Sequence, residues 1–270
     1  MITGTTRLYG ITADPIAQVR TPQAFNALFE ARGIDAVLVP FHVRPEGYAA
    51  LMEGFRRLEN LGGIVITVPH KVRTAELCDE LAPAGRLIGS VNAVRRDPET
   101  GRLIGDMFDG KGFVAGLEHA GYDPRGRDVL LVGAGGAGRA IAFAVAEAGV
   151  RRLTIANRTA AKAEALAPAV MRATPAVEVL VGPAEPQDRH ELVINATSLG
   201  LKPDDPLPVD AGRLKPSTAV ADIIMTPETT PLLAAAKDRG CPVFYGRPML
   251  ERQVDLIADF LGIPRRGPLA

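Results

Sequence analysis

The stretch VLLVGAGGAGRAIAFAVAEAG, residues 129 to 149, decides the fold class of this chain. A short apolar run leads directly into Gly133, Gly135 and Gly138, and an alanine-rich stretch of helical character follows. With this spacing, the first glycine permits a tight turn, the second lets the backbone approach a pyrophosphate, and the third lets the helix pack closely on its strand. The sequence therefore predicts a dinucleotide-binding unit. The alternative is a glycine-rich connection that binds no ligand.

The next predicted strand, RLTIANRT at residues 152–159, indicates which dinucleotide binds. NAD-binding proteins usually carry Asp or Glu at the end of this strand, whereas this chain has Asn157, Arg158 and Thr159. A guanidinium and a hydroxyl suit a 2′-phosphate, and Lys162 adds a further cation. We therefore expect NADP rather than NAD, although Arg158 could instead be a solvated side chain after a strand. The expected cofactor residues of these two segments are Gly133, Gly135, Gly136, Ala137, Gly138, Asn157, Arg158, Thr159 and Lys162.

The composition is that of a globular protein long enough for two domains, with 270 residues of which 47% are hydrophobic. Lys and Arg together number 31, as do Asp and Glu, so the formal net charge is zero. We therefore expect no overall electrostatic attraction to nucleic acid or to an anionic membrane. The most continuous apolar run, residues 140–150, falls short of the roughly 20 residues that span a bilayer. With no signal-like start, we expect a cytoplasmic monomer or homodimer whose partner is a small-molecule substrate.

Cysteine and histidine usage predicts no metal site. Cys78 and Cys241 lie far apart without metal-ligand spacing, so we expect both to be reduced and structural. Cys78 stands in AELCDELA, which has helical character, and packing there is favoured over a nucleophilic role. The four histidines are scattered and form no metal-ligand pattern.

Before the glycine-rich stretch, strand-like runs alternate with helical ones, which predicts a parallel sheet covered by helices. The strand-like runs are 7–13, 36–43 and 62–69, and the helical runs are 21–33, 45–60 and 71–82. The pattern then changes: two strand-like runs flank DPETG at 97–101, where Pro98 presets a turn and Gly101 closes it, so we expect an antiparallel hairpin. A predicted helix and a polar segment follow, which place a domain boundary between about residues 105 and 125.

With these pieces in order, the chain resembles the shikimate dehydrogenase family from about residue 8 to residue 262. The motifs that match in order and spacing are ADPIA, TVPHK, GSVNAV, GDMFDG, VGAGGAG, ANRT, INATSLG and GRPMLERQ. The resemblance implies an α/β protein with a substrate-binding domain over 1–108 and 243–270, and a Rossmann domain over 109–242 that binds NADP. It also implies that a C-terminal helix returns to the first domain, and that a cyclic ketone such as 3-dehydroshikimate is reduced with NADPH, or the alcohol oxidised.

The resemblance implies that Lys71 and Asp109 are catalytic. A ketone oxygen becomes an alkoxide when hydride reaches its carbon, so a protonated amine close by can donate the proton. In the reverse direction the neutral amine is the base. Asp109 would orient the ammonium and favour its charged form. The alternatives are a lysine that simply begins a helix, and a surface ion pair.

The resemblance also implies further site residues. Asn92 and Thr67 correspond to residues that contact the substrate, as does Gln253 on the final helix, and Thr21 is the surviving hydroxyl of a carboxylate-binding pair. Asn195 stands at the end of a Rossmann strand and would line the nicotinamide side of the cofactor site. The alternative for each amide or threonine is a buried or capping polar group.

Several positions depart from the family pattern in the direction of lower polarity. The family's S-x-S reads Val19, Arg20, Thr21 here; the other apolar replacements are Val65, Met107, Phe108 and Met225. We therefore expect hydride chemistry with altered recognition of the ring and carboxylate, which Arg20 could restore in part by a bidentate contact. Open alternatives are a quinate or other polyol dehydrogenase and a non-catalytic NADP-binding homologue. A glutamyl-tRNA reductase-like enzyme lacks support, because the chain offers no reactive cysteine or basic surface.

Overall fold

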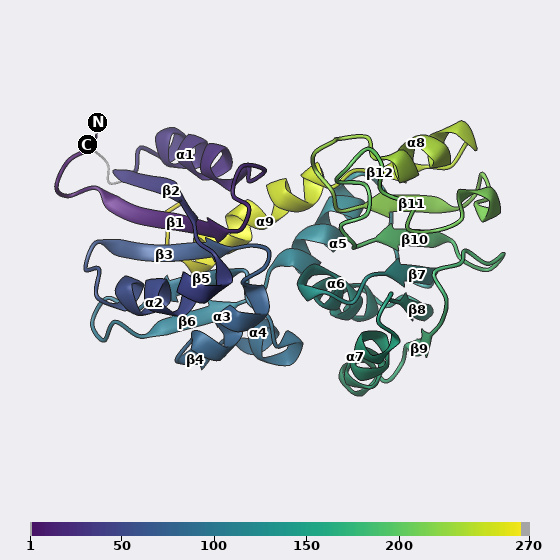
Figure 1. Ribbon diagram of the computed structural model, residues 1–270, viewed down its shortest axis with the longest axis horizontal. Helices are drawn as coiled ribbons and strands as arrows, with labels where there is room; N and C mark the ends of the chain where they lie inside the picture. The colour runs from purple at the N-terminus through teal and green to yellow at the C-terminus, as the bar shows by residue number, and fades with distance from the viewer. Residues whose placement is uncertain (1, 266–270) are drawn as a thin grey trace. The chain divides into compact units, whose positions relative to one another are not determined.

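The computed structural model describes residues 2–265, and the chain divides into two compact units (Figure 1). The N-terminal unit comprises the described residues up to Phe108 together with those from Gln253 onward, and the central unit is Asp109–Arg252. The domain bounds expected at residues 1 and 266–270 lie outside the described residues.

Three parallel strand pairs and a hairpin build the six-stranded sheet of the N-terminal unit. Its order is β2 (Ala36–His42), β1 (Arg7–Ala13), β3 (Leu61–Ile66), β5 (Ala93–Arg96), β6 (Leu103–Asp106) and β4 (Glu80–Leu81). β1 pairs in parallel with β2 and β3, and β5 is antiparallel to both β3 and β6. The expected hairpin is present: Gly101 adopts φ 71° and its N–H bonds the Asp97 carbonyl at 3.0 Å.

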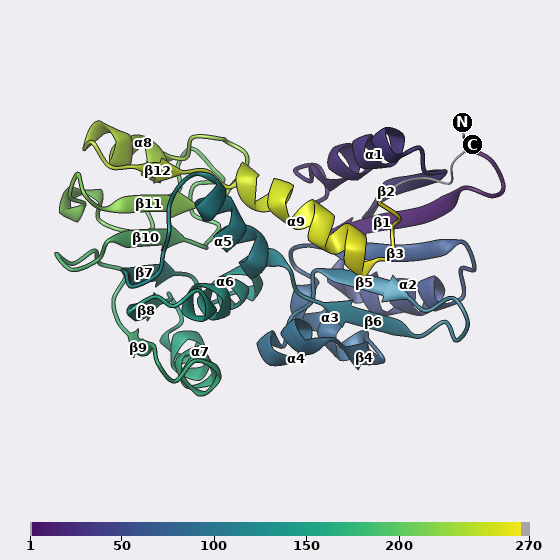
Figure 2. The ribbon, with the colours of Figure 1, turned by 180° about the vertical axis from the view of Figure 1, so that it is seen from behind.

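Helices cover both faces of this sheet. They are α1 (Thr21–Arg32), α2 (Pro45–Arg56), α3 (Lys71–Leu77) and α4 (Pro83–Ile88), with the part of α9 (Arg247–Phe260) that follows Arg252. In Figure 1, α2, α3 and α4 lie in front of the sheet, and Figure 2 shows α9 on the opposite face. Tyr48, Met52 and Phe55 of α2 pack on buried strand residues such as Ile64, while an Arg32–Asp255 ion pair of 2.7 Å joins α1 to α9.

The helix expected around Cys78 ends earlier than the sequence suggests. α3 stops at Leu77, and Cys78 is extended at ψ 146° and leads into the short strand β4. Asp79 explains the break, because its carboxylate accepts from the Leu103 N–H at 2.7 Å and so ties this segment to β6. Burial raises the pKa of the Cys78 thiol to about 12, which opposes a nucleophilic role.

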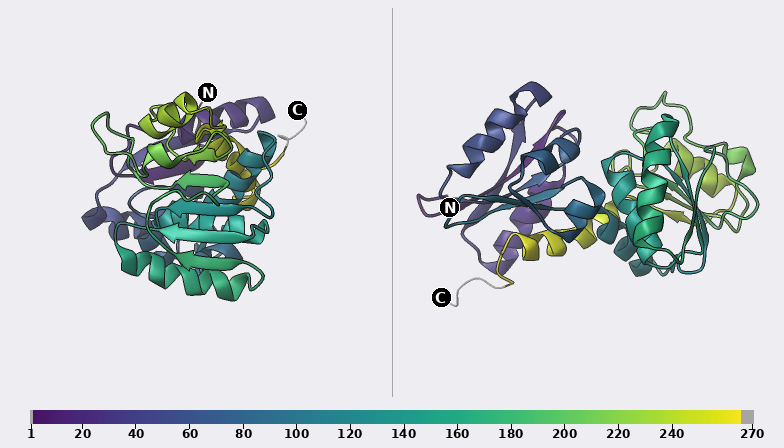
Figure 3. Two further views of the ribbon diagram at one scale, coloured as in Figure 1. Left: turned by 90° about the vertical axis from the view of Figure 1, so that its right-hand side faces the viewer. Right: turned by 90° about the horizontal axis from the view of Figure 1, so that it is seen from below.

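The central unit is a doubly wound sheet in which every strand pair is parallel. Its order is β12 (Val243–Phe244), β11 (Ala219–Asp222), β10 (Leu192–Asn195), β7 (Asp128–Val132), β8 (Arg152–Ala156) and β9 (Glu178–Val181). Figure 3 shows these strands side by side in one layer. The other elements are α5 (Asp109–His119), α6 (Gly136–Glu147), α7 (Ala160–Ala173), the 3-10 helix η1 (Ala211–Arg213) and α8 (Pro231–Asp238).

The second unit boundary lies later than sequence analysis expects. We place the return to the first domain at residue 243, whereas the compact central unit extends to Arg252. β12 accounts for the first two of these residues, because Val243 and Phe244 pair with Val220 and Ala221 of β11. A two-residue strand carries too little pattern to be recognised in the sequence, so this edge of the sheet was missed.

Small residues on α5 and α6 let these two helices pack closely. A Cβ placed at Gly110 would lie 2.2 Å from the Ala140 carbonyl oxygen and 2.7 Å from the Ala144 Cβ. A larger side chain at Gly110 would therefore force the helices apart. None of the helices within residues 2–265 is long and apolar enough to cross a membrane.

His190 makes the stability of the central unit depend on pH. Its ring is buried, the Nδ1 atom accepts from the Gln187 N–H at 3.0 Å, and burial lowers the pKa from 6.5 to about 4. Between these two values the unfolded chain binds a proton that the folded chain does not. The free energy of unfolding should therefore fall by ~3 kcal/mol as the pH drops from about 6.5 to about 4.

Urea unfolding at pH 7 and at about pH 4.5 measures this dependence. His190→Asn keeps an acceptor for the Gln187 N–H but does not titrate, so its stability should change less between the two pH values than that of the natural protein. His119→Asn, at an exposed position of α5, should leave the dependence unchanged. Equal pH dependence in all three proteins would contradict the assignment.

Candidate functional site

The N-terminal unit places its candidate residues at a topological switch point. The chain continues from β1 to β2 on one side and then to β3 on the other side of β1, so the order of connection changes direction there. Open α/β sheets bind ligands beyond the carboxyl ends of the strands at such a point. The end of β1 with the residue after it, and the segment that follows β3, are joined there: the Asp14 N–H bonds the Val68 carbonyl at 3.1 Å, and the Thr67 N–H bonds the Thr12 carbonyl at 3.1 Å. Thr67 is half-buried in the second of these segments.

Lys71 and Thr21 begin the helices that leave these two segments. Lys71 is the first residue of α3 and is half-exposed, and Thr21 is the first residue of α1 and is buried. A desolvated strand end next to a half-exposed ammonium is a setting in which an amine can exchange a proton with a bound ligand. Arg20, by contrast, is exposed.

A buried polar cluster fixes the backbone just before Lys71. The ring of His70 stacks on Tyr48 at 4.0 Å and bonds the Val43 carbonyl at 2.9 Å. The His70 carbonyl accepts from the hydroxyl of Thr74, which also bonds the Tyr48 hydroxyl at 2.6 Å. Burial lowers the pKa of His70 and raises that of Tyr48 to about 12, so both rings are neutral near pH 7. Sequence analysis missed this cluster, because nothing in the spacing of its members links them.

Asp14 and His42 form a second pair that sequence analysis missed. His42 ends β2 and Asp14 follows β1, and the His42 Nε2 lies 2.8 Å from the Asp14 Oδ1. Both side chains are partly exposed. Their positions directly after strands were the available signal, since neighbouring parallel strands bring such residues to one edge of a sheet.

The structure brings Asn92 and Gln253 together. The Asn92 Nδ2 donates to the Gln253 Oε1 at 3.0 Å, and the Asn92 Oδ1 accepts from the Phe108 N–H at 2.9 Å. Both amides are buried, at 2% and 7% exposure. The pair ties the entrance of β5 to α9 within the N-terminal unit, so these residues have a structural role whether or not they also bind a ligand.

The apolar residues that sequence analysis singles out as departures differ in how deeply they are buried. Met107 is a core residue at 1% exposure, and Phe108 packs on Phe260 with ring centroids 5.3 Å apart. Val65 is buried on β3 beside the switch point, whereas Val19 is half-buried and Met225 of the central unit is exposed. Val65, Met107 and Phe108 therefore contribute packing rather than hydrogen bonds to the N-terminal unit.

The glycine-rich loop of the central unit has the geometry that each glycine requires. Gly133 adopts φ 114°, and a Cβ there would lie 2.6 Å from the Ala196 carbonyl oxygen. A Cβ at Gly138 would lie 2.1 Å from the Gly133 carbonyl oxygen, whereas nothing lies within 4 Å of a Cβ at Gly135. Gly133 and Gly138 thus permit close packing, and Gly135 borders open space where a phosphate can approach.

The N-terminus of α6 faces this open space without a side-chain cap. Gly136 is the first residue of the helix, Ala137 follows it, and Gly135 is the N-cap residue. The first N–H groups of the helix have no side-chain acceptor, which suits an anionic ligand. The loop lies between β7 and β10, the switch point of this sheet.

In the segment 157–162, the side chain of Asn157 supports the glycine-rich loop, and Arg158 and Lys162 are exposed cations. Asn157 Oδ1 accepts from the Ala134 N–H at 2.9 Å, and its Nδ2 donates to the Thr159 carbonyl at 2.9 Å, so its side chain joins the glycine-rich loop to the end of β8. Beyond these two bonds the amide keeps one N–H and one acceptor lone pair, so the cofactor contact that the sequence suggests stays a prediction. Arg158 and Lys162 are exposed, and neither makes an ion pair with any residue in the described range 2–265.

Asn195 is likewise committed to the protein itself. Its Nδ2 donates to the Leu199 carbonyl at 3.1 Å and to the Asp222 Oδ2 at 3.0 Å. Its Oδ1 accepts from the N–H and the hydroxyl of Thr197. These four bonds use the full hydrogen-bonding capacity of an amide. The expected place of Asn195 beside the nicotinamide stays a prediction, and any contact there would be one of packing.

Asp109 begins α5 and is buried at 3% exposure. Lys71 belongs to the N-terminal unit and Asp109 to the central unit, so their pairing stays a prediction. Among the described residues there is no group of three or more His, Cys, Asp or Glu side chains that could hold a metal ion.

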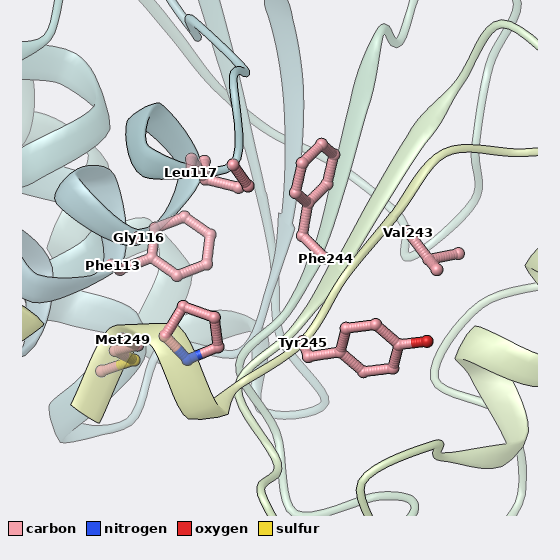
Figure 4. Close-up of a pocket in the computed structure, with 9 residues that line it drawn as sticks. Phe113, Gly116, Leu117, Val243, Phe244, Tyr245 and Met249 are labelled. Atoms are coloured by element: carbon pink, nitrogen blue, oxygen red, sulfur yellow. The ribbon is translucent and has the colours of Figure 1, made fainter. Parts of the chain in front are cut away.

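The central unit also contains an apolar cavity of about 190 Å³ (Figure 4). Phe113 and Leu117 of α5, Phe244 and Tyr245 at β12, and Pro248 and Met249 of α9 line it. None of the residues expected to bind substrate or cofactor is among its lining residues. The cavity offers aromatic and aliphatic surface rather than the polar groups that a phosphate or a polyol requires.

Models of two families match the chain: the shikimate dehydrogenase substrate binding domain over residues 11–94, and shikimate / quinate 5-dehydrogenase over residues 118–199. A shikimate dehydrogenase (NADP(+)) of Rubrobacter xylanophilus is 40% identical over 252 residues, which are 92% of this chain and 88% of the relative. The chain belongs to the shikimate dehydrogenase family. The resemblance inferred from the motifs is thereby confirmed.

Solved structures of a shikimate dehydrogenase and of a ketofructose reductase share the fold. The enzyme of Thermus thermophilus in complex with NADP(H) and shikimate has a TM-score of 0.86 and 29% identity, covering 97% of this chain and 96% of its own. The ligand-free 5-ketofructose reductase of a Gluconobacter strain has a TM-score of 0.82 and 36% identity, covering 95% of this chain and 92% of its own. The expected α/β architecture with a substrate-binding domain and a Rossmann domain is confirmed.

Proposed function

We propose that the chain is an NADP-dependent oxidoreductase that transfers hydride between the nicotinamide and a shikimate-like cyclic alcohol or ketone. The observation that carries this is the 40% identity of the chain to a shikimate dehydrogenase (NADP(+)) over 92% of its length. In this chain Lys71 begins α3, the helix that follows β3. The open glycine-rich loop beside exposed cations supports the choice of NADP. Reduction of 3-dehydroshikimate to shikimate is the leading reaction.

Lys71 is proposed as the general acid for ketone reduction. Bound NADPH supplies hydride to the carbonyl carbon. The Lys71 ammonium hydrogen-bonds the carbonyl oxygen and gives it a proton, so that the products are an alcohol and a neutral amine. In alcohol oxidation the neutral amine accepts that proton. Asp109 is proposed to orient the ammonium and to favour its charged form.

The remaining contacts are proposed by the same correspondence. We propose that four side chains contact the substrate: Thr21, Thr67, Asn92 and Gln253. The amides of Asn92 and Gln253 are already hydrogen-bonded to each other. For the cofactor, the backbone of Gly135, Gly136 and Ala137 is proposed to hold the pyrophosphate, with Gly133 and Gly138 shaping the loop. Arg158, Thr159 and Lys162 are proposed to surround the 2′-phosphate.

A second candidate substrate is a polyol or keto-sugar without a carboxylate. The observation that favours it is the loss of hydrogen-bonding side chains at Val19 and Val65, while a solved relative at 36% identity is a 5-ketofructose reductase. A carboxylate placed against apolar side chains would lose its hydration without compensation, whereas a neutral hydroxyl loses less. Quinate is a further candidate, since one matching family includes quinate 5-dehydrogenase.

Cofactor turnover with a substrate panel tests these proposals. The purified chain is incubated with NADP and shikimate or quinate, and with NADPH and a neutral keto-sugar, while nicotinamide absorbance is followed. Turnover of any of them removes the alternative of a non-catalytic NADP-binding homologue. Absence of turnover with all, at cofactor concentrations that saturate binding, would overturn the proposed activity.

Restoring the family's polar residues should improve shikimate turnover. Val19→Ser together with Val65→Asn replaces two apolar groups, and one bond to a charged group corresponds to about ten- to a hundredfold in kcat/KM. We expect at least a tenfold rise in kcat/KM for shikimate, with little change for a neutral substrate. If the natural protein already turns over shikimate well and the double variant gains nothing, Arg20 or Thr21 holds the carboxylate.

We propose a reducing compartment, the cytoplasm, as the site of action. Both cysteines are free in the structure, which fits such a location. A monomer or a homodimer is proposed as the active form.

A further inference from the structure

Asp222 is a buried carboxylate that the proposed chemistry does not use. It ends β11 at 1% exposure, and burial raises its pKa. Its Oδ2 accepts from the Thr230 hydroxyl at 2.8 Å and from the Asn195 Nδ2 at 3.0 Å, and its Oδ1 accepts from the Ile224 N–H at 3.0 Å. None of its partners in the described residues is a cation. Such a group costs stability unless its bonds are needed.

The bonds of Asp222 lead to the glycine-rich loop in two steps. Asn195, held by Asp222, accepts from the Thr197 N–H and donates to the Leu199 carbonyl, so it shapes the turn that follows β10. Within that turn lies Ala196, whose carbonyl oxygen would be 2.6 Å from a Cβ at Gly133. The turn and the glycine-rich loop therefore pack directly on each other, at the switch point between β7 and β10.

Thr230 completes the network from the other side. It precedes α8, and its hydroxyl bonds both Asp222 and the Leu233 N–H of that helix. It is fully buried at 0% exposure. The network thus joins the start of α8, the end of β11 and the turn after β10 through the hydrogen bonds of three side chains.

We propose that Asp222, Asn195 and Thr230 form a positioning network for the dinucleotide. It holds residues 196–199 against Gly133 and thereby fixes the wall of the crevice in which the cofactor binds. This inference rests on the proposed binding of NADP. The three side chains act through the backbone of the turn and do not touch the cofactor themselves.

A matched pair of threonine variants tests the network. Thr230→Val removes the hydroxyl that donates to Asp222 and keeps the shape of the side chain, and Thr230→Ser restores the hydroxyl. The control is Thr218→Val: Thr218 is also buried in this unit, but it precedes the amino end of β11 and bonds the His190 carbonyl at 3.3 Å. Both valine variants should lower the melting temperature, since each loses a buried hydrogen bond.

NADPH affinity separates positioning from stability alone. Thr230→Val should raise the Kd for NADPH about tenfold, the weight of one bond to a charged group, while kcat at saturating NADPH stays within about threefold. Thr230→Ser and Thr218→Val should stay within about twofold of the natural Kd. Equal Kd values for the two valine variants would overturn the network. If the natural protein binds no NADPH, the proposed function fails and this inference with it.

Hydrogen exchange on the natural protein gives a second test that needs no variant. If the turn forms a wall of the cofactor crevice, NADPH should slow exchange of the Thr197 and Leu199 amides at least about threefold, by restricting the opening of the turn. The control is the amide of Gln187, which is bonded to His190 after β9. Exchange at Thr197 and Leu199 that does not respond to saturating NADPH would overturn the proposal even if Thr230→Val fails to fold.

Discussion

Replacing Lys71 by alanine is expected to lower kcat by about 10²- to 10⁴-fold, the range for a positioned acid or base. The Kd for NADPH should stay near that of the natural protein, because Lys71 begins α3 in the unit that lacks the glycine-rich loop. Single-turnover reduction of the best substrate in the panel measures the chemical step directly, and fluorescence titration measures the Kd.

Arg73→Ala is the matched control for Lys71→Ala. Arg73 is a cation on the same short helix, is exposed, and pairs with Glu76 rather than facing a strand end. Its loss should change kcat by less than about twofold, as removal of an exposed ion pair does. Activity of Lys71→Ala within about threefold of the natural protein, where chemistry limits the rate, would show that the lysine is only a surface charge.

Arg158→Leu is expected to weaken NADP binding about ten- to a hundredfold while NAD binding changes little. The guanidinium is exposed at the end of β8, where no carboxylate stands, and a charged hydrogen bond to a 2′-phosphate contributes roughly 1.5 to 3 kcal/mol. Titration of the purified protein with each cofactor gives both dissociation constants, and their ratio reports on the 2′-phosphate alone.

The control for Arg158 lies at the far end of the helix that follows it. Arg172 occupies the last turn of α7 and is exposed, so Arg172→Leu makes the same change of charge in the same unit. It should leave the preference for NADP within about twofold. A similar loss for NADP and NAD in Arg158→Leu would refute the contact with the 2′-phosphate.

Much of this architecture could be predicted because it is encoded locally. The apolar run before Gly133, the spacing to Gly138 and the alanine-rich helix each have one common structural interpretation, and the geometry of the loop agrees with it. The hairpin around Gly101 is local in the same sense. Family membership and the α/β class, inferred from motifs, agree with the comparisons.

What could not be predicted depends on contacts between distant segments. Asn195 stands in a short motif that suggests a cofactor residue, but the motif does not reveal its hydrogen bond to Asp222, which lies 27 residues away in sequence. The contact between His42 and Asp14 likewise joins residues that are 28 positions apart in sequence. Cys78 leaves the expected helix because Asp79 bonds a strand that comes later in the chain. No window of sequence contains both partners of such bonds.

The two hydrogen bonds of Asn157 indicate which positions should be left unchanged when the cofactor preference is altered by directed evolution. Because its amide joins the Ala134 N–H to the Thr159 carbonyl, a library that randomises the whole ANRT segment would mostly yield clones with a damaged loop. The side chains of Arg158 and Lys162 are exposed and make no hydrogen bond or ion pair with the described residues, so replacing them should leave the loop intact. A small library confined to these two codons should therefore return a high share of folded clones, and among them variants that accept NAD.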